Sequence, residues 1–155
     1  MESKRAKQLY DKYFDTVFRV CFLLVKNESD AKDMTQETFC RLIERSPLFE
    51  SDEKAKAWLI VTASNCCKSL LKKWWYKKAD TIEDFKEKTY EFSDNEILRT
   101  VLSLDKKYSI PTYLYYYEGY KTGEIAEILS EKQSTIQTRL AKARELLKIE
   151  LSERE

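Results

Sequence analysis

The side chains with the clearest capacity for recognition chemistry lie near the carboxyl end of the chain. Residues 135–148 read TIQTRLAKARELLK, with apolar residues at helical spacing at Ile136, Leu140 and Ala143. If these three turn inward, a helical wheel places a polar surface on the opposite side. Such a surface can hydrogen-bond to base edges in a DNA groove. Its members are Gln137, Thr138, Ala141 and Lys142.

A second, shorter amphipathic segment precedes this helix. Residues 120–129 read YKTGEIAEIL, and residues 130–134 between the two segments are polar. A break this short requires the two helices to meet at a corner, which is the pattern of a helix-turn-helix. Cations surround the outward surface and would suit phosphates, although an ordinary solvated helical hairpin remains an alternative. These cations are Lys132, Arg139, Arg144 and Lys148.

The composition predicts an all-α protein. The 155 residues include only 2 Gly and 2 Pro, and 43% are hydrophobic and 35% charged, which is typical of a globular chain with short connections. There is no apolar run long enough to cross a bilayer, and the N-terminus lacks the apolar core of a signal peptide. We therefore expect a cytoplasmic protein with no direct membrane insertion.

Charge is distributed unevenly although the formal net charge is only +1. Residues 66–78 carry five Lys and no acid, whereas residues 80–96 carry seven acids and two Lys. Near-neutral totals can hide basic patches of this kind. Lysines interleaved with Trp74, Trp75 and Tyr76 suit nucleic acid, although core tryptophans beside solvated lysines are an equal alternative.

The residues that usually support catalysis or metal binding are scarce. The chain has no histidine, which removes the commonest general base, and it has no glycine-rich phosphate loop or nucleophile motif. The cysteines form no C-x-x-C pair, so a zinc site is not expected. We expect no catalytic residue, no metal and no cofactor. The expected state of the cysteines is buried and inert, with a redox role for Cys66 or Cys67 left open.

Hydrophobic periodicity divides the chain into two helical units. The first contains helices expected over residues 3–26, from a cap at Ser29-Asp30 to Ser46-Pro47, and over residues 56–76, with Trp58 in the core. Residues 79–95 lack a sustained period and are predicted to form a flexible acidic linker. The second unit spans 96–155, with Asp105 as a helix cap and Gly119 as a helix stop.

Two blocks of the sequence together resemble bacterial sigma factors of the sigma-70 family, in their small extracytoplasmic-function type. In the first unit the matching residues are Asp30-Ala31-x-Asp33-Met34-x-Gln36-Glu37-x-Phe39, then Ala57-Trp58-Leu59 and Asn65. In the second they are Tyr117-Glu118-Gly119-Tyr120, Glu124 to Leu129, and Thr135-Ile136-x-x-Arg139-Leu140-x-x-Ala143-Arg144. The resemblance implies sigma region 2 over residues 1–78 and sigma region 4 over residues 96–155.

The resemblance also implies a role for each polar surface. The helix after Asp30 would dock on the clamp helices of the largest subunit of core RNA polymerase, where acids and amides suit a basic partner. The third helix would open the −10 element of promoter DNA, and the helix-turn-helix would read the −35 element. The implied polymerase-binding residues are Asp30, Asp33, Gln36, Glu37 and Phe39. The implied −10 residues are Asn65, Lys68, Lys72 and Lys73. The implied −35 residues are Ser134, Thr135, Gln137, Thr138, Arg139, Ala141, Lys142 and Arg144.

The sequence departs from this family at the corner of the helix-turn-helix. Ser130 and Glu131 stand where Gly and an apolar residue are usual, and Gln137 replaces a frequent basic residue. Gln favours adenine edges, whereas Arg favours guanine. The preferred −35 sequence is therefore expected to differ from that of family members with a basic residue at this position.

The sequence as a whole favours a non-catalytic initiation subunit that directs core polymerase to promoters. Members of this family are often held inactive by an anti-sigma factor, which makes such a protein a further candidate partner. Two other functions compete with this one. The chain could be a stand-alone helix-turn-helix regulator acting as a dimer on palindromic sites, or a helical adaptor that binds only protein.

Overall fold

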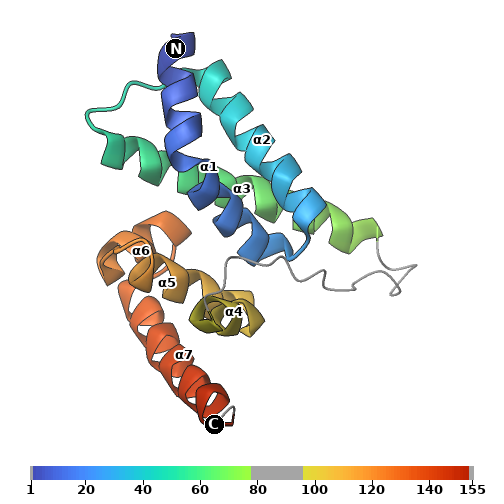
Figure 1. Ribbon diagram of the computed structural model, residues 1–155, viewed down its shortest axis with the longest axis vertical. Helices are drawn as coiled ribbons and strands as arrows, with labels where there is room; N and C mark the ends of the chain where they lie inside the picture. Colours follow the sequence, from blue (N-terminus) through green and yellow to red (C-terminus); the bar gives the residue numbers. More distant parts are fainter. Residues whose placement is uncertain (1, 78–95, 154–155) are drawn as a thin grey trace. The chain divides into compact units, whose positions relative to one another are not determined.

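The computed structural model describes residues 2–77 and 96–153, with side chains described for residues 2–73 and 99–148. The described residues form seven helices and no strand, and the chain divides into two compact units, Met1–Tyr90 and Glu91–Glu155 (Figure 1). The prediction of two small all-α domains is therefore confirmed. The predicted linker over 79–95 lies outside the described residues, and the predicted domain boundaries stay a prediction.

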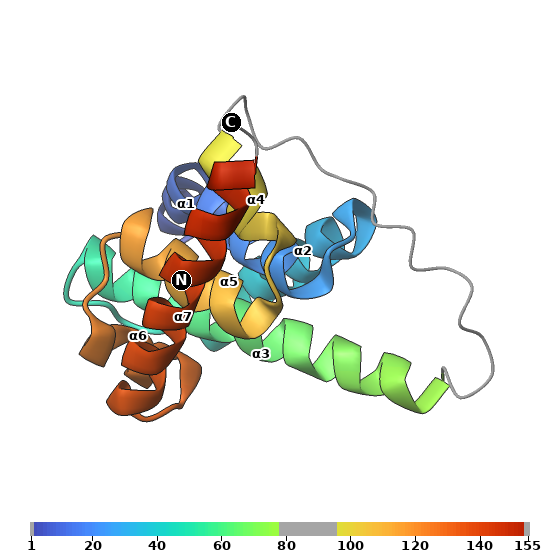
Figure 2. The same ribbon diagram turned by 90° about the horizontal axis from the view of Figure 1, so that it is seen from below.

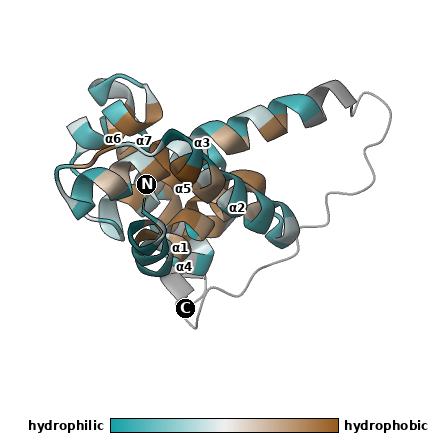
Figure 3. Ribbon diagram, turned by 90° about the horizontal axis from the view of Figure 1, so that it is seen from above, coloured by the Kyte–Doolittle hydropathy of each residue, from teal (hydrophilic) through white to brown (hydrophobic). Residues whose placement is uncertain are grey.

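The first unit packs three long helices around one core. They are α1 (Ser3–Val25), α2 (Glu28–Arg45) and α3 (Asp52–Lys77). One face of α1 is buried and includes Leu9, Tyr13 and Val17. Burying an aliphatic side chain such as Leu9 or Val17 stabilises the fold by roughly 1.5–3 kcal/mol. The carboxyl-terminal end of α3 projects beyond α1 and α2 (Figure 2). Hydrophobic and hydrophilic stretches alternate along α3 (Figure 3), as expected for a helix with one buried face.

The connection from α1 to α2 differs from the predicted one by two residues. Lys26 closes α1 in the left-handed region, with φ 52°, and donates its N–H to the Phe22 carbonyl at 2.8 Å. Asn27 then caps α2, because its side-chain oxygen accepts the Asp30 N–H at 3.0 Å. The predicted cap at Ser29-Asp30 is wrong, since both residues already lie inside the helix. The predicted end of α2 is confirmed: Ser46 follows Arg45 with φ 43°.

A cluster of polar contacts fixes the beginning of α3 against α1. The Asp52 carboxylate accepts from Arg5 Nη2 at 2.7 Å and from Lys12 Nζ at 2.8 Å. The Tyr13 hydroxyl donates to the Asp52 carbonyl at 3.2 Å. Helix α3 therefore begins at Asp52, four residues before the predicted start at Lys56. Trp58 is partly exposed and meets Phe49 edge-on at 5.9 Å between ring centroids, so its prediction as a core residue is wrong.

The second unit contains four helices. They are α4 (Glu96–Ser103), α5 (Lys106–Tyr116), α6 (Thr122–Leu129) and α7 (Gln133–Glu153). The predicted cap at Asp105 is confirmed, because its carboxylate accepts the Lys107 N–H at 3.3 Å. Pro111 lies inside α5 and is buried there. Helix α5 ends at Tyr116, and Gly119, the predicted stop, takes φ 74° in the turn that follows. That turn closes with a bond from the Tyr120 N–H to the Leu114 carbonyl at 3.0 Å.

The Asp52 cluster predicts a pH-dependent part of the stability of the first unit. Hydrogen bonds from Lys12 and then Arg5 lower the pKa of Asp52 from 3.8 to about 2. Because the folded-state pKa is depressed, this contribution is present above the unfolded pKa and is lost as pH falls through the folded one. Unfolding of the wild type and Asp52→Asn followed from pH 7 to pH 2 should show a gap in stability that closes between about pH 4 and pH 2.

The matched control is Glu53→Gln, which neutralises an exposed acid next to Asp52 in the first turn of α3. The difference in stability between Glu53→Gln and the wild type should not show this narrowing between about pH 4 and pH 2. A gap for Asp52→Asn that is unchanged down to pH 2 would contradict the assignment.

Candidate nucleic-acid interface

The backbone of the corner between α6 and α7 confirms a helix-turn-helix. Ser130 takes the left-handed conformation, with φ 55° and ψ 45°. The Glu131 N–H donates to the Ala126 carbonyl at 2.9 Å, which satisfies one of the last carbonyls of α6. At the other side of the corner, Gln133 Nε2 donates to Thr122 Oγ1 at 3.0 Å. Ser130, where the resemblance led us to expect glycine, therefore adopts a left-handed conformation itself.

The start of α6 has no capping hydrogen bond from the side chain of Lys121. The Lys121 N–H instead donates to the Glu124 carboxylate at 2.9 Å, one turn into the helix. This is half of a capping box, in which the acid at the third helical position reaches back to the residue before the helix. The first helix of the motif therefore begins with one of its backbone N–H groups satisfied by its own Glu124.

Burial sets which side of α7 faces outward. Ile136, Leu140 and Ala143 are each no more than 1% exposed, as the periodicity predicted. Most predicted −35 residues therefore face solvent, and Thr135 and Arg139 are partly buried. The exposed members are Ser134, Gln137, Thr138, Ala141, Lys142 and Arg144.

Several side chains of α7 are held by neighbours within the same unit. Arg144 Nε donates to the Tyr116 hydroxyl of α5 at 2.8 Å, and the Thr138 hydroxyl donates to the Ser134 carbonyl at 2.9 Å. Arg139 Nη1 lies 3.6 Å from Glu131 Oε1, and Lys142 Nζ lies 3.7 Å from Glu145 Oε2. Tyr116 and Glu131 could not be identified as partners from the sequence. Tyr116, for example, is 28 residues from Arg144, and no periodic signal joins them.

The exposed face of α3 forms a second cationic surface. Asn65, Lys68, Lys72 and Lys73 are all exposed, while Ser64, Cys66 and Cys67 on the opposite side are buried. Spacings of three, four and seven residues place Asn65, Lys68 and Lys72 along one side of the helix. The side chains of Trp74 and Trp75 lie outside the described residues.

Helix α2 presents an acidic and amide surface. Asp33, Gln36 and Glu37 are exposed and Asp30 is partly exposed, whereas Thr35, Thr38 and Phe39 face the core. Gln36 Nε2 donates to the Tyr10 hydroxyl at 3.1 Å. Glu37 pairs with Arg41 at 3.4 Å. Phe39 is only 4% exposed and packs edge-on against Tyr10, with ring centroids 4.9 Å apart.

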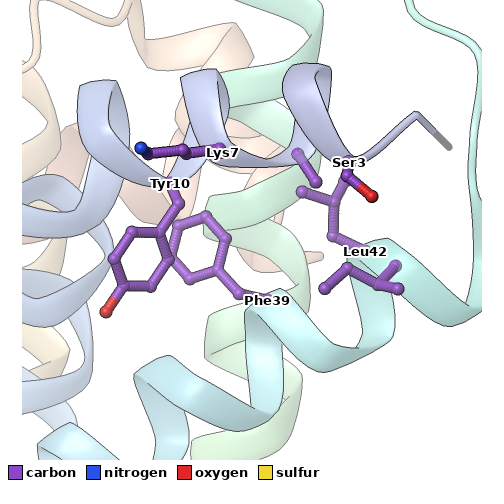
Figure 4. Close-up of a pocket in the computed structure, with 7 residues that line it drawn as sticks. Ser3, Lys7, Tyr10, Phe39 and Leu42 are labelled. Atoms are coloured by element: carbon purple, nitrogen blue, oxygen red, sulfur yellow. The ribbon is translucent and has the colours of Figure 1, made fainter.

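An apolar groove lies beside this surface, between α1 and α2. Its volume is about 290 Å³, and the rings of Tyr10 and Phe39 lie next to each other in its wall (Figure 4). Ile43 is 58% exposed at the groove although it is apolar. The lining residues are Ser3, Ala6, Lys7, Tyr10, Phe39, Leu42 and Ile43.

The cysteines are divided between core and surface. Cys21, Cys66 and Cys67 are buried as expected, whereas Cys40 is exposed, so the expectation of four buried thiols is wrong. Burial raises the pKa of the Cys66 thiol. A hydrogen bond with Cys21 and then burial raise the pKa of Cys67. Because the thiolate is the reactive form, these environments suppress redox reactivity at both positions. Among the described residues no cluster of potential metal ligands is found.

None of the described helices is both long and apolar enough to cross a bilayer.

Two family models of known proteins match this chain. The family model for sigma-70 region 2 matches residues 9–76, and the model for sigma-70 region 4 matches residues 94–147. RNA polymerase sigma factor SigV of Bacillus subtilis is 28% identical over 141 residues, covering 87% of this chain and 84% of SigV. The extracytoplasmic-function sigma factor SigW of the same organism is 27% identical, covering 92% and 87%.

A solved structure shares the fold. The sigma factor RpoE of Bartonella quintana, crystallised with the anti-sigma factor NepR, superimposes with a TM-score of 0.79 at 21% identity, covering 96% of this chain and 98% of RpoE. A second solved protein, CnrH in complex with the cytosolic domain of CnrY, gives a TM-score of 0.67 at 18% identity, covering 99% of this chain and 92% of CnrH.

Proposed function

We infer that this chain, which belongs to the sigma-70 family in its extracytoplasmic-function type, is a sigma factor that directs core RNA polymerase to specific promoters. The observation that carries this inference is the presence of both sigma regions in order along one chain. Sigma factors are not enzymes, and we propose that this chain likewise catalyses nothing itself. Its work would lie in the cytoplasm, where polymerase and DNA are found.

We assign polymerase docking to the first unit, residues 1–78. The exposed carboxylates and amides of α2 offer acceptors to a basic partner helix, and charge complementarity of this kind sets orientation and encounter rate. Phe39 supports this surface from beneath, because its ring is buried against Tyr10. The clamp helices of the largest polymerase subunit are the partner that the family assignment supplies.

We assign opening of the −10 element to α3. Its outward face combines an amide, Asn65, with the ammonium groups of Lys68, Lys72 and Lys73. Ammonium groups neutralise phosphates without reading sequence, whereas an amide can bond to a base edge. Unstacking a base costs a few kcal/mol, and contacts to the separated strand would offset that cost.

We assign reading of the −35 element to α7, within residues 96–155. Its outward amide and hydroxyl groups at Gln137, Thr138 and Ser134 suit base edges in the major groove, while Lys142 and Arg144 suit phosphates. The segment 79–95 would join the two units as a linker.

We further propose that an anti-sigma factor is a partner of this chain. Both structural relatives, RpoE and CnrH, were solved with proteins that bind them, NepR and the cytosolic domain of CnrY. The stand-alone regulator and the protein-only adaptor are not favoured, because neither explains region 2 and region 4 together.

The test of the function is transcription in vitro. Purified chain mixed with core polymerase should co-elute with it and should start transcripts from promoters selected by the complex out of a randomised DNA library. Core polymerase alone is the control and should not start at these sites. Failure both to co-elute and to direct initiation would overturn the inference.

Asp33→Arg tests the docking surface. Asp33 is an exposed carboxylate on α2, and reversing its charge places a cation against a basic partner, which we expect to weaken core binding at least about 100-fold. The measurement is a binding titration with labelled core polymerase, with circular dichroism to confirm folding.

The matched control for this variant is Asp15→Arg, which makes the same charge change on the exposed side of α1. It should bind core polymerase almost as the wild type does. Core binding retained by Asp33→Arg would remove α2 from the docking surface.

Gln137→Arg tests the reading helix. Gln favours adenine and Arg favours guanine, each good bidentate pair being worth about 1–3 kcal/mol of discrimination. Selection from a library randomised at the −35 element should therefore return different preferred bases for the variant. Lys142→Ala is the comparison, because loss of a phosphate contact should weaken all sequences alike. An unchanged preference for Gln137→Arg would remove this side chain from base contact.

A further inference from the structure

The corner of the helix-turn-helix carries an acid, Glu131, directly after the left-handed Ser130. Its carboxylate Oε1 lies 3.6 Å from Arg139 Nη1 of α7. The corner therefore carries a negative charge directed at one of the cations beside the proposed DNA-reading surface.

The backbone holds this carboxylate in place. Ser130 is left-handed, and the Glu131 N–H is bonded to the Ala126 carbonyl at 2.9 Å, so the path of the chain at Glu131 is fixed on the α6 side. The bond from Gln133 Nε2 to Thr122 Oγ1 closes the corner from the α7 side. Because the backbone at Glu131 is already fixed, pairing with Arg139 costs the freedom of the two side chains only, which favours the ion pair.

The Glu131–Arg139 pair is better shielded than the Lys142–Glu145 pair on the same helix. The side chains of Arg139 and Glu131 are 28% and 39% exposed, whereas those of Lys142 and Glu145 are 52% and 71% exposed. Exposed pairs at three-residue spacing are weak and easily screened by salt. The pair at the corner should therefore persist where the Lys142–Glu145 pair exchanges with solvent and phosphate.

A paired arginine behaves differently toward DNA from a free one. Phosphate contacts by free cations release counterions and supply affinity that does not depend on sequence. A carboxylate held against the guanidinium competes with phosphate for its N–H donors and repels the phosphate backbone. The result is a lower affinity for any duplex, while base-edge contacts made by other residues are unaffected.

We propose that Glu131 is a specificity-determining residue of the DNA site: its ion pair with Arg139 fixes the guanidinium and suppresses sequence-independent binding to duplex DNA. The proposal rests on the assignment of α7 to the −35 element. It concerns how the chain avoids binding to DNA of the wrong sequence. Because the net charge is only +1, charged groups close to the DNA surface determine this property.

The test compares two duplexes bound by the full chain assembled with core polymerase. One duplex carries a −35 element selected by the wild-type complex, and the other carries the same bases in scrambled order. Glu131→Gln should tighten binding to the scrambled duplex by roughly 3–10-fold at low salt and should steepen the dependence of log K on log salt. The gain on the selected duplex should be smaller, so the ratio of the two affinities falls.

The matched control is Glu127→Gln on α6. It removes one exposed acid from the same hairpin without touching the Glu131–Arg139 pair. Glu127→Gln should change the affinities for the two duplexes slightly and by the same factor. If Glu131→Gln changes the affinities for both duplexes by the same factor as Glu127→Gln does, the proposal is overturned. Only the net charge of the chain would then matter.

Two further variants locate the effect at the pair. In an Arg139→Ala background, Glu131→Gln should change the affinity for the scrambled duplex no more than Glu127→Gln does. If the full increase in affinity persists in that background, the effect does not act through Arg139. Glu131→Asp retains the charge on a shorter side chain and serves if Glu131→Gln folds poorly. It should also lower the specificity ratio, and an unchanged ratio would contradict the proposal. A wild-type complex that selects no −35 element would instead reject the proposed function of α7.

Discussion

The rotation of α7 about its own axis is the constraint on which the rest of the DNA-reading unit depends. The core contains three almost completely buried side chains of α7, Ile136, Leu140 and Ala143. Rotating the helix by one residue, which is about 100°, would expose them. Each buried aliphatic side chain is worth roughly 1.5–3 kcal/mol, so the core selects one rotation. The outward position of Gln137 and Lys142 follows from this choice.

The first unit uses the same principle twice. On α2 the inward placement of Thr35, Thr38 and Phe39 turns Asp33 and Glu37 outward. On α3 the inward placement of Ser64, Cys66 and Cys67 leaves the Asn65 and lysine face outward. Polymerase docking and promoter opening are thus assigned to different helices of one core, and the Asp52 cluster fixes where α3 begins relative to α1.

Many side chains on these surfaces are already engaged before any partner arrives. Gln36 is bonded to Tyr10, Glu37 to Arg41, and Arg144 to Tyr116. Preformed contacts reduce the side-chain entropy lost on binding, which is a large part of the cost of association. They also determine which groups remain exposed for recognition. On α7 the Glu131–Arg139 pair adds a counter-charge, in keeping with a chain whose affinity for promoters would come largely from polymerase.

The sequence by itself determined the helical class, the corner between α6 and α7, and the outward side of α7, because helical periodicity is a local property written in each segment. It also carried the family resemblance, through residues such as Asp33 and Asn65. It did not determine the Asn27 cap, the exposure of Ile43, or the partial exposure of Trp58 against Phe49. Only the tertiary structure decided these, together with the Arg144–Tyr116 and Glu131–Arg139 pairs, because they depend on which helix lies beside which. Helices of equal periodicity can pack in several ways, and the partner of a side chain is known only when the packing is known.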